Sequence, residues 1–199
     1  MSLFVETIRV EGGEAPLLSL HQARLDNTLR ACCGTDAPRI DLTGIVNGLA
    51  FTPRRMKVRV VYGCNGVTEV TCEQYRLRHI GSLKVVCDDT IDYAFKRTDR
   101  RCLQRLTAMR DNCDDVLIVR NGLLTDTSFT NIALLVDGRW LTPAQPLLAG
   151  VMRSRLIADG ILRESDLTLD DVRRATGIRL TNAMTDWGEM EVLPSRIVP

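Results

Sequence analysis

The sequence predicts a mixed α/β fold of the α+β kind, made of two small domains. Short runs that alternate apolar and polar residues, as half-buried strands do, recur along the chain. Stretches with helical spacing and capping residues lie between them. The 199 residues suffice for one large domain or for two small ones that share a seam. We expect a small α/β domain over residues 1–88 and a larger domain over residues 89–199.

The first half should contain a strand, two helices and three further strands. Residues 3–10 alternate in polarity, and the Gly-Gly pair that follows marks a turn. A helix is expected from about Ser19, whose hydroxyl suits an N-cap, to Ala31, with Gly34 closing it. The remaining expected elements are a short helix within 41–49 and strands over 56–62, 67–75 and 82–87.

The second half mixes helices and strands in the same way. Asn121-Gly122 and Asp137-Gly138 are strong turn pairs, and the second should join two strands as a tight hairpin. We expect helices over 99–109, 150–158 and 169–175, and strands over 115–119, 131–136, 140–141 and 178–181.

Charge and composition argue against nucleic-acid and membrane partners. Twenty-six basic residues face twenty-five acidic ones, and no basic stretch provides a footprint for nucleic acid. No apolar run is long enough to span a bilayer, and Glu6 and Arg9 near the N-terminus are unlike a signal peptide. The seven cysteines include no C-x-x-C pair, so we expect reduced thiols and a cytoplasmic protein. No metal site is expected.

Lys96 is the first candidate for a chemical role. It lies in TIDYAFKRTDR, where the chain leaves an expected strand and approaches a helix. Taken alone, Lys96 reads as a surface charge, as most lysines are. A catalytic lysine needs a partly desolvated site so that its amine is neutral and can form a Schiff base, and Tyr93 and Phe95 could help to supply one.

Three further segments could hold a charged group. In GLLTDTSFTNIALLV, Asp126 lies in a Gly-led turn, where it either builds an Asx turn or presents its carboxylate to a cation. In PLLAGVMRSRL, Gly150 precedes a helix whose first amides suit a phosphate, although helix starts are common. In LSLHQARL, His21 and Arg24 share one helix face, and Arg24 is either a surface cation or a phosphate clamp.

The order of these segments is more specific than any one of them. The series FVETIR, HQARL, YAFKRTDR, LLTDTSFTNI, LTP and LLAGVMR resembles the class IV (fold type IV) enzymes that depend on pyridoxal 5′-phosphate (PLP), from Phe4 to about Met184. This family includes branched-chain aminotransferases, D-amino-acid aminotransferases and aminodeoxychorismate lyase. The resemblance implies two small domains with PLP at their interface, a homodimer and a small-molecule substrate.

The resemblance also implies a role for each matching position. Lys96 is similar to the lysine that forms the Schiff base with PLP, and Arg24 to the arginine that clamps the phosphate. Val151 and Met152 match positions whose backbone amides bind the same phosphate, although Met152 lacks the hydroxyl often found there. Asp126 matches the acid that pairs with the pyridine nitrogen, where the family usually has glutamate.

Thr7 favours the lyase among the reactions of this family. The lyase pattern has a threonine in the first strand where the branched-chain enzymes have glycine, and FVETIR puts Thr7 there, although β-branched residues are common in strands. Thr7 would give a proton to the departing fragment. The usual arginine of the lyases near the third strand is not evident, and Arg59 could replace it in binding a carboxylate. Tyr93 is expected on the phenolic side of the cofactor.

We therefore expect an aminodeoxychorismate lyase, which converts 4-amino-4-deoxychorismate to 4-aminobenzoate and pyruvate in folate precursor synthesis. Two alternatives stay open. One is a class IV aminotransferase acting on branched-chain or D-amino acids, and the other is a non-catalytic homologue that binds PLP or another phosphorylated ligand. The chain is shorter than typical members, mostly before Lys96, in the domain that shapes the substrate pocket.

Overall fold

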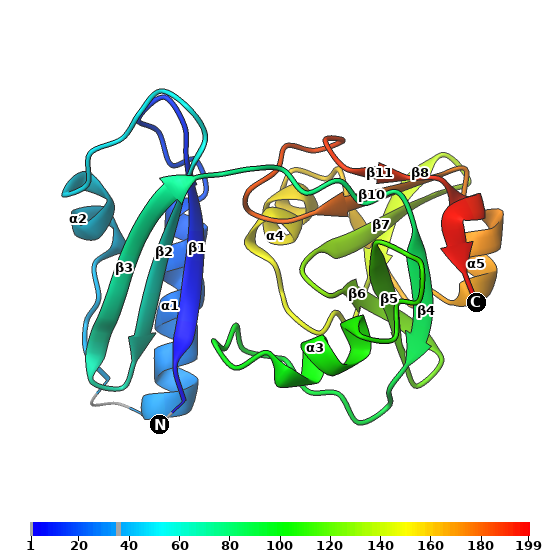
Figure 1. The fold of residues 1–199 in the computed structure, drawn as a ribbon, viewed down its shortest axis with the longest axis horizontal. Coiled ribbons are helices and arrows are strands. Elements are labelled where there is room, and N and C mark those ends of the chain that lie inside the picture. Colours follow the sequence, from blue (N-terminus) through cyan, green and yellow to red (C-terminus); the bar gives the residue numbers. More distant parts are fainter. Residues whose placement is uncertain (1, 35–36) are drawn as a thin grey trace. The chain divides into compact units, whose positions relative to one another are not determined.

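The computed structural model describes residues 2–34 and 37–199, which form two compact units (Figure 1). Unit 1 comprises Met1–Arg76 and Phe95–Asp99, and unit 2 comprises Leu77–Ala94 and Arg100–Pro199.

This division differs from the expected boundary after residue 88. The strand β4 (Leu83–Cys87) pairs in parallel with β5 (Asp115–Arg120), so residues 77–88 belong to unit 2. The segment Phe95–Asp99, in turn, belongs to unit 1.

Unit 1 is a three-stranded antiparallel sheet with a helix on one face (Figure 1). Its elements are β1 (Phe4–Val10), α1 (Leu18–Cys33), α2 (Leu42–Asn47), β2 (Met56–Gly63) and β3 (Gly66–Gln74). The strands lie in the order β1-β2-β3. Phe4, Ile8 and Val10 of β1 pack with Leu25 and Leu29 of α1, because alternate residues of a strand point to the same face. The apolar residues at alternate positions of 3–10 thus form part of the core of this unit.

The residues that cap α1 match the sequence prediction only at the C-terminal end of the helix. Ser19 lies within the first turn of α1 and is not its N-cap; Leu17 holds that position and makes no side-chain cap. The expected end is confirmed, because Gly34 follows the last helical residue with a φ of 77° that suits glycine. Asp41 caps α2 by accepting a hydrogen bond of 2.9 Å from the backbone N–H of Thr43.

The segment Phe95–Asp99 runs beside the N-terminal part of β1. The N–H of Val5 donates to the carbonyl of Lys96 at 2.9 Å, and the N–H of Thr98 donates to the carbonyl of Leu3 at 2.9 Å. The ring of Phe95 packs edge-on against Phe4, with 6.2 Å between the ring centroids. These contacts fix the backbone of Lys96 at the edge of the sheet of unit 1.

Unit 2 is built on a nine-stranded mixed sheet. In addition to β4 and β5, its strands are β6 (Leu123–Thr127), β7 (Asn131–Val136), β8 (Arg139–Pro143), β9 (Arg163–Ser165), β10 (Gly177–Thr181), β11 (Glu191–Val192) and β12 (Ile197–Val198). The main path is β11-β10-β7-β6-β5-β4-β12, with β8 beside β7 and β9 beside β8. The helices are α3 (Arg101–Thr107), α4 (Val151–Ala158) and α5 (Leu169–Arg174), with a 3-10 turn, η1 (Pro194–Arg196).

The helices and strands expected in unit 2 are present, with ends shifted by at most two residues. Both turn pairs are confirmed, because Asn121 and Asp137 have positive φ and each precedes a glycine that also has positive φ. The sequence did not predict β6, β9, β11 or β12. Of these, β6 matters most for function, because it contains Asp126.

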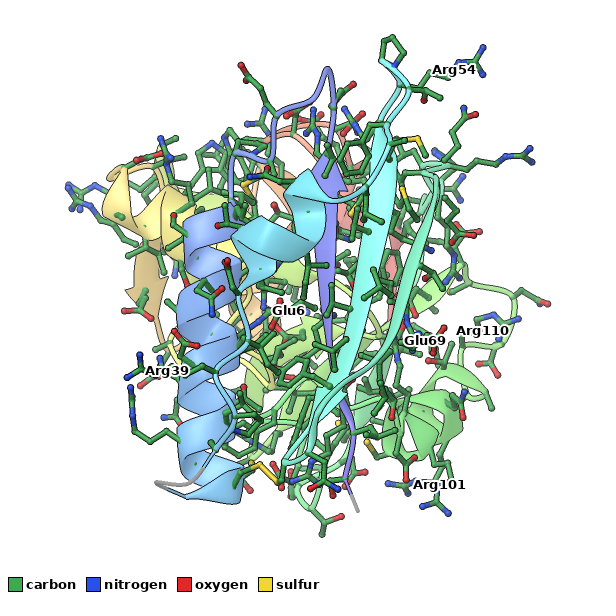
Figure 2. All side chains as sticks on the ribbon, turned by 90° about the vertical axis from the view of Figure 1, so that its left-hand side faces the viewer. Glu6, Arg39, Arg54, Glu69, Arg101 and Arg110 are labelled. Atoms are coloured by element: carbon green, nitrogen blue, oxygen red, sulfur yellow. A yellow bond between two sulfur atoms is a disulfide. The ribbon has the colours of Figure 1, made fainter. Side chains whose placement is uncertain are left out.

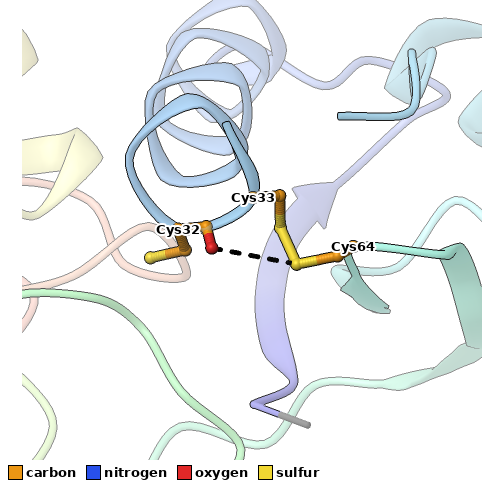
Figure 3. The surroundings of a disulfide bond; sticks show 3 residues. All are labelled: Cys32, Cys33 and Cys64. Carbon is orange, nitrogen blue, oxygen red and sulfur yellow. Dashed lines mark hydrogen bonds between the residues drawn. A yellow bond between two sulfur atoms is a disulfide. The ribbon is translucent and has the colours of Figure 1, made fainter. Parts of the chain in front are cut away.

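A disulfide joins Cys33, the last residue of α1, to Cys64 in the β2–β3 turn (Figure 3). The expectation of seven reduced thiols is therefore wrong for this pair. The bridge links positions 31 residues apart, so no local spacing pattern indicated it. Because disulfides are rare in the reducing cytoplasm, the cytoplasmic location, which was inferred partly from the cysteines, stays a prediction.

Within the described ranges 2–34 and 37–199, no helix is both long and apolar enough to cross a membrane. The same residues contain no group of three or more histidine, cysteine or acidic side chains that could hold a metal ion.

Candidate functional site

Lys96 is one of only three lysines in the chain. Lys57 pairs with Glu73 at 2.5 Å, and Lys84 pairs with Asp111 at 3.3 Å. Lys96 is partly buried, its backbone is held against β1, and its charge lowers the pKa of His21. An influence of this kind requires the two side chains to lie within electrostatic reach of each other.

A buried carboxylate in β1 holds the two helix residues singled out from the sequence. The side chain of Glu6 is fully buried between α1 and the sheet of unit 1 (Figure 2). Its Oε2 atom lies 2.6 Å from Nδ1 of His21 and 2.5 Å from Nη2 of Arg24, and Oε1 lies 3.0 Å from Nε of Arg24. His21 and Arg24 thus share one helix face, as their spacing predicted, and converge on one carboxylate.

The electrostatics of this cluster fix its protonation at neutral pH. Burial would raise the pKa of Glu6, but the charge of Arg24 and the hydrogen bonds from His21 and Arg24 bring that pKa below its usual value. Burial lowers the pKa of His21, and the charges of Arg24 and Lys96 lower it further, against the influence of Glu6. Glu6 is therefore ionised and His21 neutral, with its proton on Nδ1, where it donates to Glu6.

Thr7 and Arg59 lie on the opposite face of the same sheet. They are directly opposite each other in the β1–β2 register. The neighbours of Arg59 along β2, Val58 and Val60, pack in the core with α1, so alternation puts Arg59 on the other face. Arg59 also pairs with Glu69 of β3 at 3.4 Å. A hydroxyl and a guanidinium are thus neighbours on this face.

Asp126 lies in a strand, which corrects the expected turn. It belongs to β6 and pairs with Asn131 of β7, and the turn is formed by residues 128–130. Its carboxylate is buried, with Oδ1 accepting from Asn131 Nδ2 at 2.7 Å and Oδ2 accepting from the N–H of Leu148 at 2.9 Å. Burial raises the pKa of Asp126 to about 6, although these two hydrogen bonds and the charge of Arg153 oppose the change.

The start of α4 packs against the same asparagine. Gly150 precedes the helix, and no side chain caps the first turn, which begins with Val151 and Met152. A Cβ added to Gly150 would lie 2.0 Å from Oδ1 of Asn131, far inside van der Waals contact. Asn131 also donates to the carbonyl of Leu148 at 2.9 Å. It therefore connects Asp126 to the backbone that leads into α4.

We expect Gly150→Ala to lower the free energy of unfolding by about 1–3 kcal/mol, the usual cost of overpacking. The φ of −71° at Gly150 suits alanine, so the effect is steric. Asn131 cannot simply turn away, because Asp126 and Leu148 hold its amide. Urea unfolding measures the change.

Gly48→Ala is the matched control for this substitution, since its added Cβ would meet the nearest atom at an ordinary 3.4 Å. Equal stability of Gly150→Ala and the wild-type protein would contradict the packing described.

The structure thus groups the predicted residues within each unit. In unit 1, Arg24 and His21 meet at Glu6, and Lys96 lies within electrostatic reach. In unit 2, Asp126 is connected to the start of α4 through Asn131. Tyr93 is buried in a separate apolar cluster of unit 2 with Leu103 and Leu106 of α3, among others.

Sequence reasoning missed the roles of Glu6 and Asn131. The signal for Glu6 was available, because it occupies a position of the alternating pattern that is otherwise apolar, between Phe4 and Ile8. No local signal pointed to Asn131, whose contacts depend on how β7 meets the residues before α4.

The chain matches the family model of class IV aminotransferases over residues 3–191. A Haemophilus influenzae protein named only "uncharacterized" is 30% identical over 182 residues, which cover 90% of this chain and 96% of the relative. A "putative aminodeoxychorismate lyase" of Schizosaccharomyces pombe is 30% identical over 87 residues, or 41% of this chain and 38% of the relative.

Solved structures agree with this match. A "putative 4-amino-4-deoxychorismate lyase" from Haemophilus somnus is 28% identical, with a TM-score of 0.86 and coverage of 92% of this chain and 97% of the other. A "hypothetical aminotransferase" from Mycobacterium tuberculosis in its PLP-bound form, 20% identical, shares the fold with a TM-score of 0.77 over 99% of this chain and 83% of the other. The expected mixed α/β fold of type IV is confirmed. The chain belongs to the class IV aminotransferase family.

Proposed function

We propose that this protein is a PLP-dependent lyase that converts 4-amino-4-deoxychorismate to 4-aminobenzoate and pyruvate, a reaction that supplies a folate precursor. The observation that carries the choice of reaction is Thr7, a hydroxyl on β1 directly opposite Arg59. The similarity to proteins described as lyases of this kind supports the same choice.

The charged and polar groups on each unit fit the chemistry of PLP. Unit 1 offers the amine of Lys96 and the guanidinium of Arg24, which Glu6 orients. Unit 2 offers the uncapped first turn of α4, at Val151 and Met152, and the carboxylate of Asp126. Oδ1 of Asp126 accepts from Asn131 and Oδ2 from Leu148, and each oxygen has a further lone pair, which can accept from a pyridinium N–H.

Each group would have a separate task. Lys96 would hold the cofactor covalently until the substrate amine displaces it, and the freed amine would then take the proton from the substrate carbon that bears the amino group. Arg24 and the amides of Val151 and Met152 would bind the phosphate, while Asp126 would keep the ring nitrogen protonated. When bound, PLP supplies an electron sink for the pair released by that carbon.

Thr7 and Arg59 would act on the substrate. Loss of the ring proton lets the bond between the ring and the enolpyruvyl oxygen break, and the ring becomes aromatic. The departing enolpyruvate must gain a proton to become pyruvate, and the hydroxyl of Thr7 is our candidate donor. Arg59 would bind a substrate carboxylate. We include in this proposal the homodimer that the family resemblance implies.

The direct test supplies the purified protein with PLP and 4-amino-4-deoxychorismate. We expect pyruvate and 4-aminobenzoate in equal amounts. Transfer of an amino group from a branched-chain or D-amino acid to a keto acid, without these products, would favour the aminotransferase alternative. PLP binding with neither reaction would favour a non-catalytic homologue.

We expect Thr7→Ala to lower turnover about 100-fold, the lower end of what a positioned proton donor contributes, with little change in PLP affinity. Steady-state production of pyruvate and titration with PLP measure the two quantities. Thr71→Ala is the matched control, because Thr71 of β3 faces Arg59 from the other side. Equal losses of turnover and PLP affinity would contradict the donor role of Thr7.

A further inference from the structure

Glu6 is an exception in the core of unit 1. It occupies a fully buried position on the face of β1 where Phe4 and Ile8 pack against α1. A buried carboxylate with its two partners is often no more stabilising than well-packed apolar residues of similar size. The cluster of Glu6, His21 and Arg24 therefore calls for an explanation other than stability.

His21 and Arg24 are held as a pair by one oxygen atom. Nδ1 of His21 and Nη2 of Arg24 lie 2.6 and 2.5 Å from the same Oε2 of Glu6. The imidazole and the guanidinium are consequently neighbours, with the carboxylate behind both. An anion bound by Arg24 therefore lies near the imidazole of His21.

The second nitrogen of His21 has no hydrogen-bond partner among the described residues, although it is fully buried. Buried polar atoms without a partner are rare in native proteins, and each one needs an explanation, such as a catalytic role or contact with a water or an ion. The charge of Lys96 acts on the same imidazole, so this unpartnered nitrogen belongs to the neighbourhood of the proposed cofactor lysine.

We infer that His21 is a further ligand of the phosphate group of PLP, bound through Nε2 and held in place by Glu6. This inference rests on the proposed function. Because neutral His21 has its ring proton on Nδ1, Nε2 accepts a hydrogen bond from a phosphate oxygen that carries a proton. Nε2 could donate to a fully deprotonated phosphate only if the imidazole took up a second proton, which the negative charge of the phosphate would favour. Glu6 fixes the other nitrogen as a donor, which keeps the ring from turning.

The substitution His21→Asn tests the role of Nε2 separately from that of Nδ1. The asparagine amide can still donate to Glu6 from near the position of Nδ1, but nothing replaces Nε2. We compare the dissociation constants of PLP and of pyridoxal, which lacks the phosphate. We expect the PLP constant to rise about tenfold and the pyridoxal constant to stay unchanged. His21→Gln, whose amide reaches nearer to the position of Nε2, should recover part of the PLP affinity.

Two outcomes would overturn the inference. One is an unchanged PLP constant in His21→Asn, and the other is an equal loss of PLP and pyridoxal, which would indicate a role in folding or in the covalent link. Failure of the proposed function looks different, because the wild-type protein would then form no PLP adduct that borohydride can fix. Urea unfolding of His21→Asn identifies any general loss of structure.

Discussion

Lys96→Ala is expected to abolish the visible absorbance of PLP on this protein and the adduct that borohydride fixes. Alanine offers no amine, so the covalent link to the cofactor cannot form. Turnover should fall at least 10⁴-fold, because the same amine carries the proton in the reaction. Absorbance spectra, mass spectrometry after borohydride reduction and the pyruvate assay measure these effects.

Because the chain has only three lysines, the site of the adduct can be assigned to one of them. PLP can react with side-chain amines at only three positions, Lys57, Lys84 and Lys96. Lys57→Ala, in the same unit, is the matched control and should keep the adduct and the activity. Retention of the adduct in Lys96→Ala, or its mapping by peptide analysis to Lys57 or Lys84, would rule out the cofactor role of Lys96.

Local patterns predicted most elements but not the contacts that build the site. The alternation in residues 3–10 and the turn pairs at Asn121 and Asp137 were sufficient, because strands and tight turns depend on nearby residues. The strand that contains Asp126 was missed, since its pairing is irregular: Leu123, Leu124 and Thr127 pair with β5, with a shift of register, and only Asp126 pairs with β7. Thr127, Ser128 and Thr130 resemble a continuous turn in the sequence.

Contacts between distant segments account for the remaining differences. The placement of Lys96 beside β1 depends on hydrogen bonds to Leu3 and Val5, more than ninety residues earlier in the chain. The Cys33–Cys64 bridge is likewise non-local. The ordered family motifs identified Lys96, Arg24 and Asp126 without these contacts. They could not reveal that Glu6 and Asn131 hold two of these three side chains.

Asp126→Asn is the second substitution with a large expected effect. A carboxylate near the ring nitrogen of PLP favours its protonated form, and a neutral amide does not. The amide would also set an N–H group against the N–H of Leu148 or the amide of Asn131, which now donate to the two oxygens. We expect turnover to fall roughly 100-fold, with the adduct on Lys96 retained.

The same substitution should change how the stability of the cofactor-free protein depends on pH. The pKa of Asp126 is about 6 in the folded protein, against a reference value of 3.8. The folded state therefore binds this proton more tightly, and the associated stability is present below pH 4 and is lost as the pH rises through 6. At neutral pH the free energy of unfolding is therefore lower than at low pH by on the order of 3 kcal/mol from this group.

Urea unfolding of the cofactor-free protein between pH 4 and pH 8 tests this expectation. The free energy of unfolding of the wild-type protein should fall across that interval as Asp126 loses its proton. The corresponding fall should be absent in Asp126→Asn. Asp115→Asn is the matched control for turnover, because Asp115 is also buried, in the neighbouring strand β5, but its carboxylate accepts only from Ser128 in the contacts described. If Asp126→Asn kept full turnover while Asp115→Asn lost it, the acid that serves the cofactor would be Asp115. If neither variant lost turnover, no aspartate of this sheet would protonate the ring, and the charge of the cofactor would have to be balanced from outside β5 and β6.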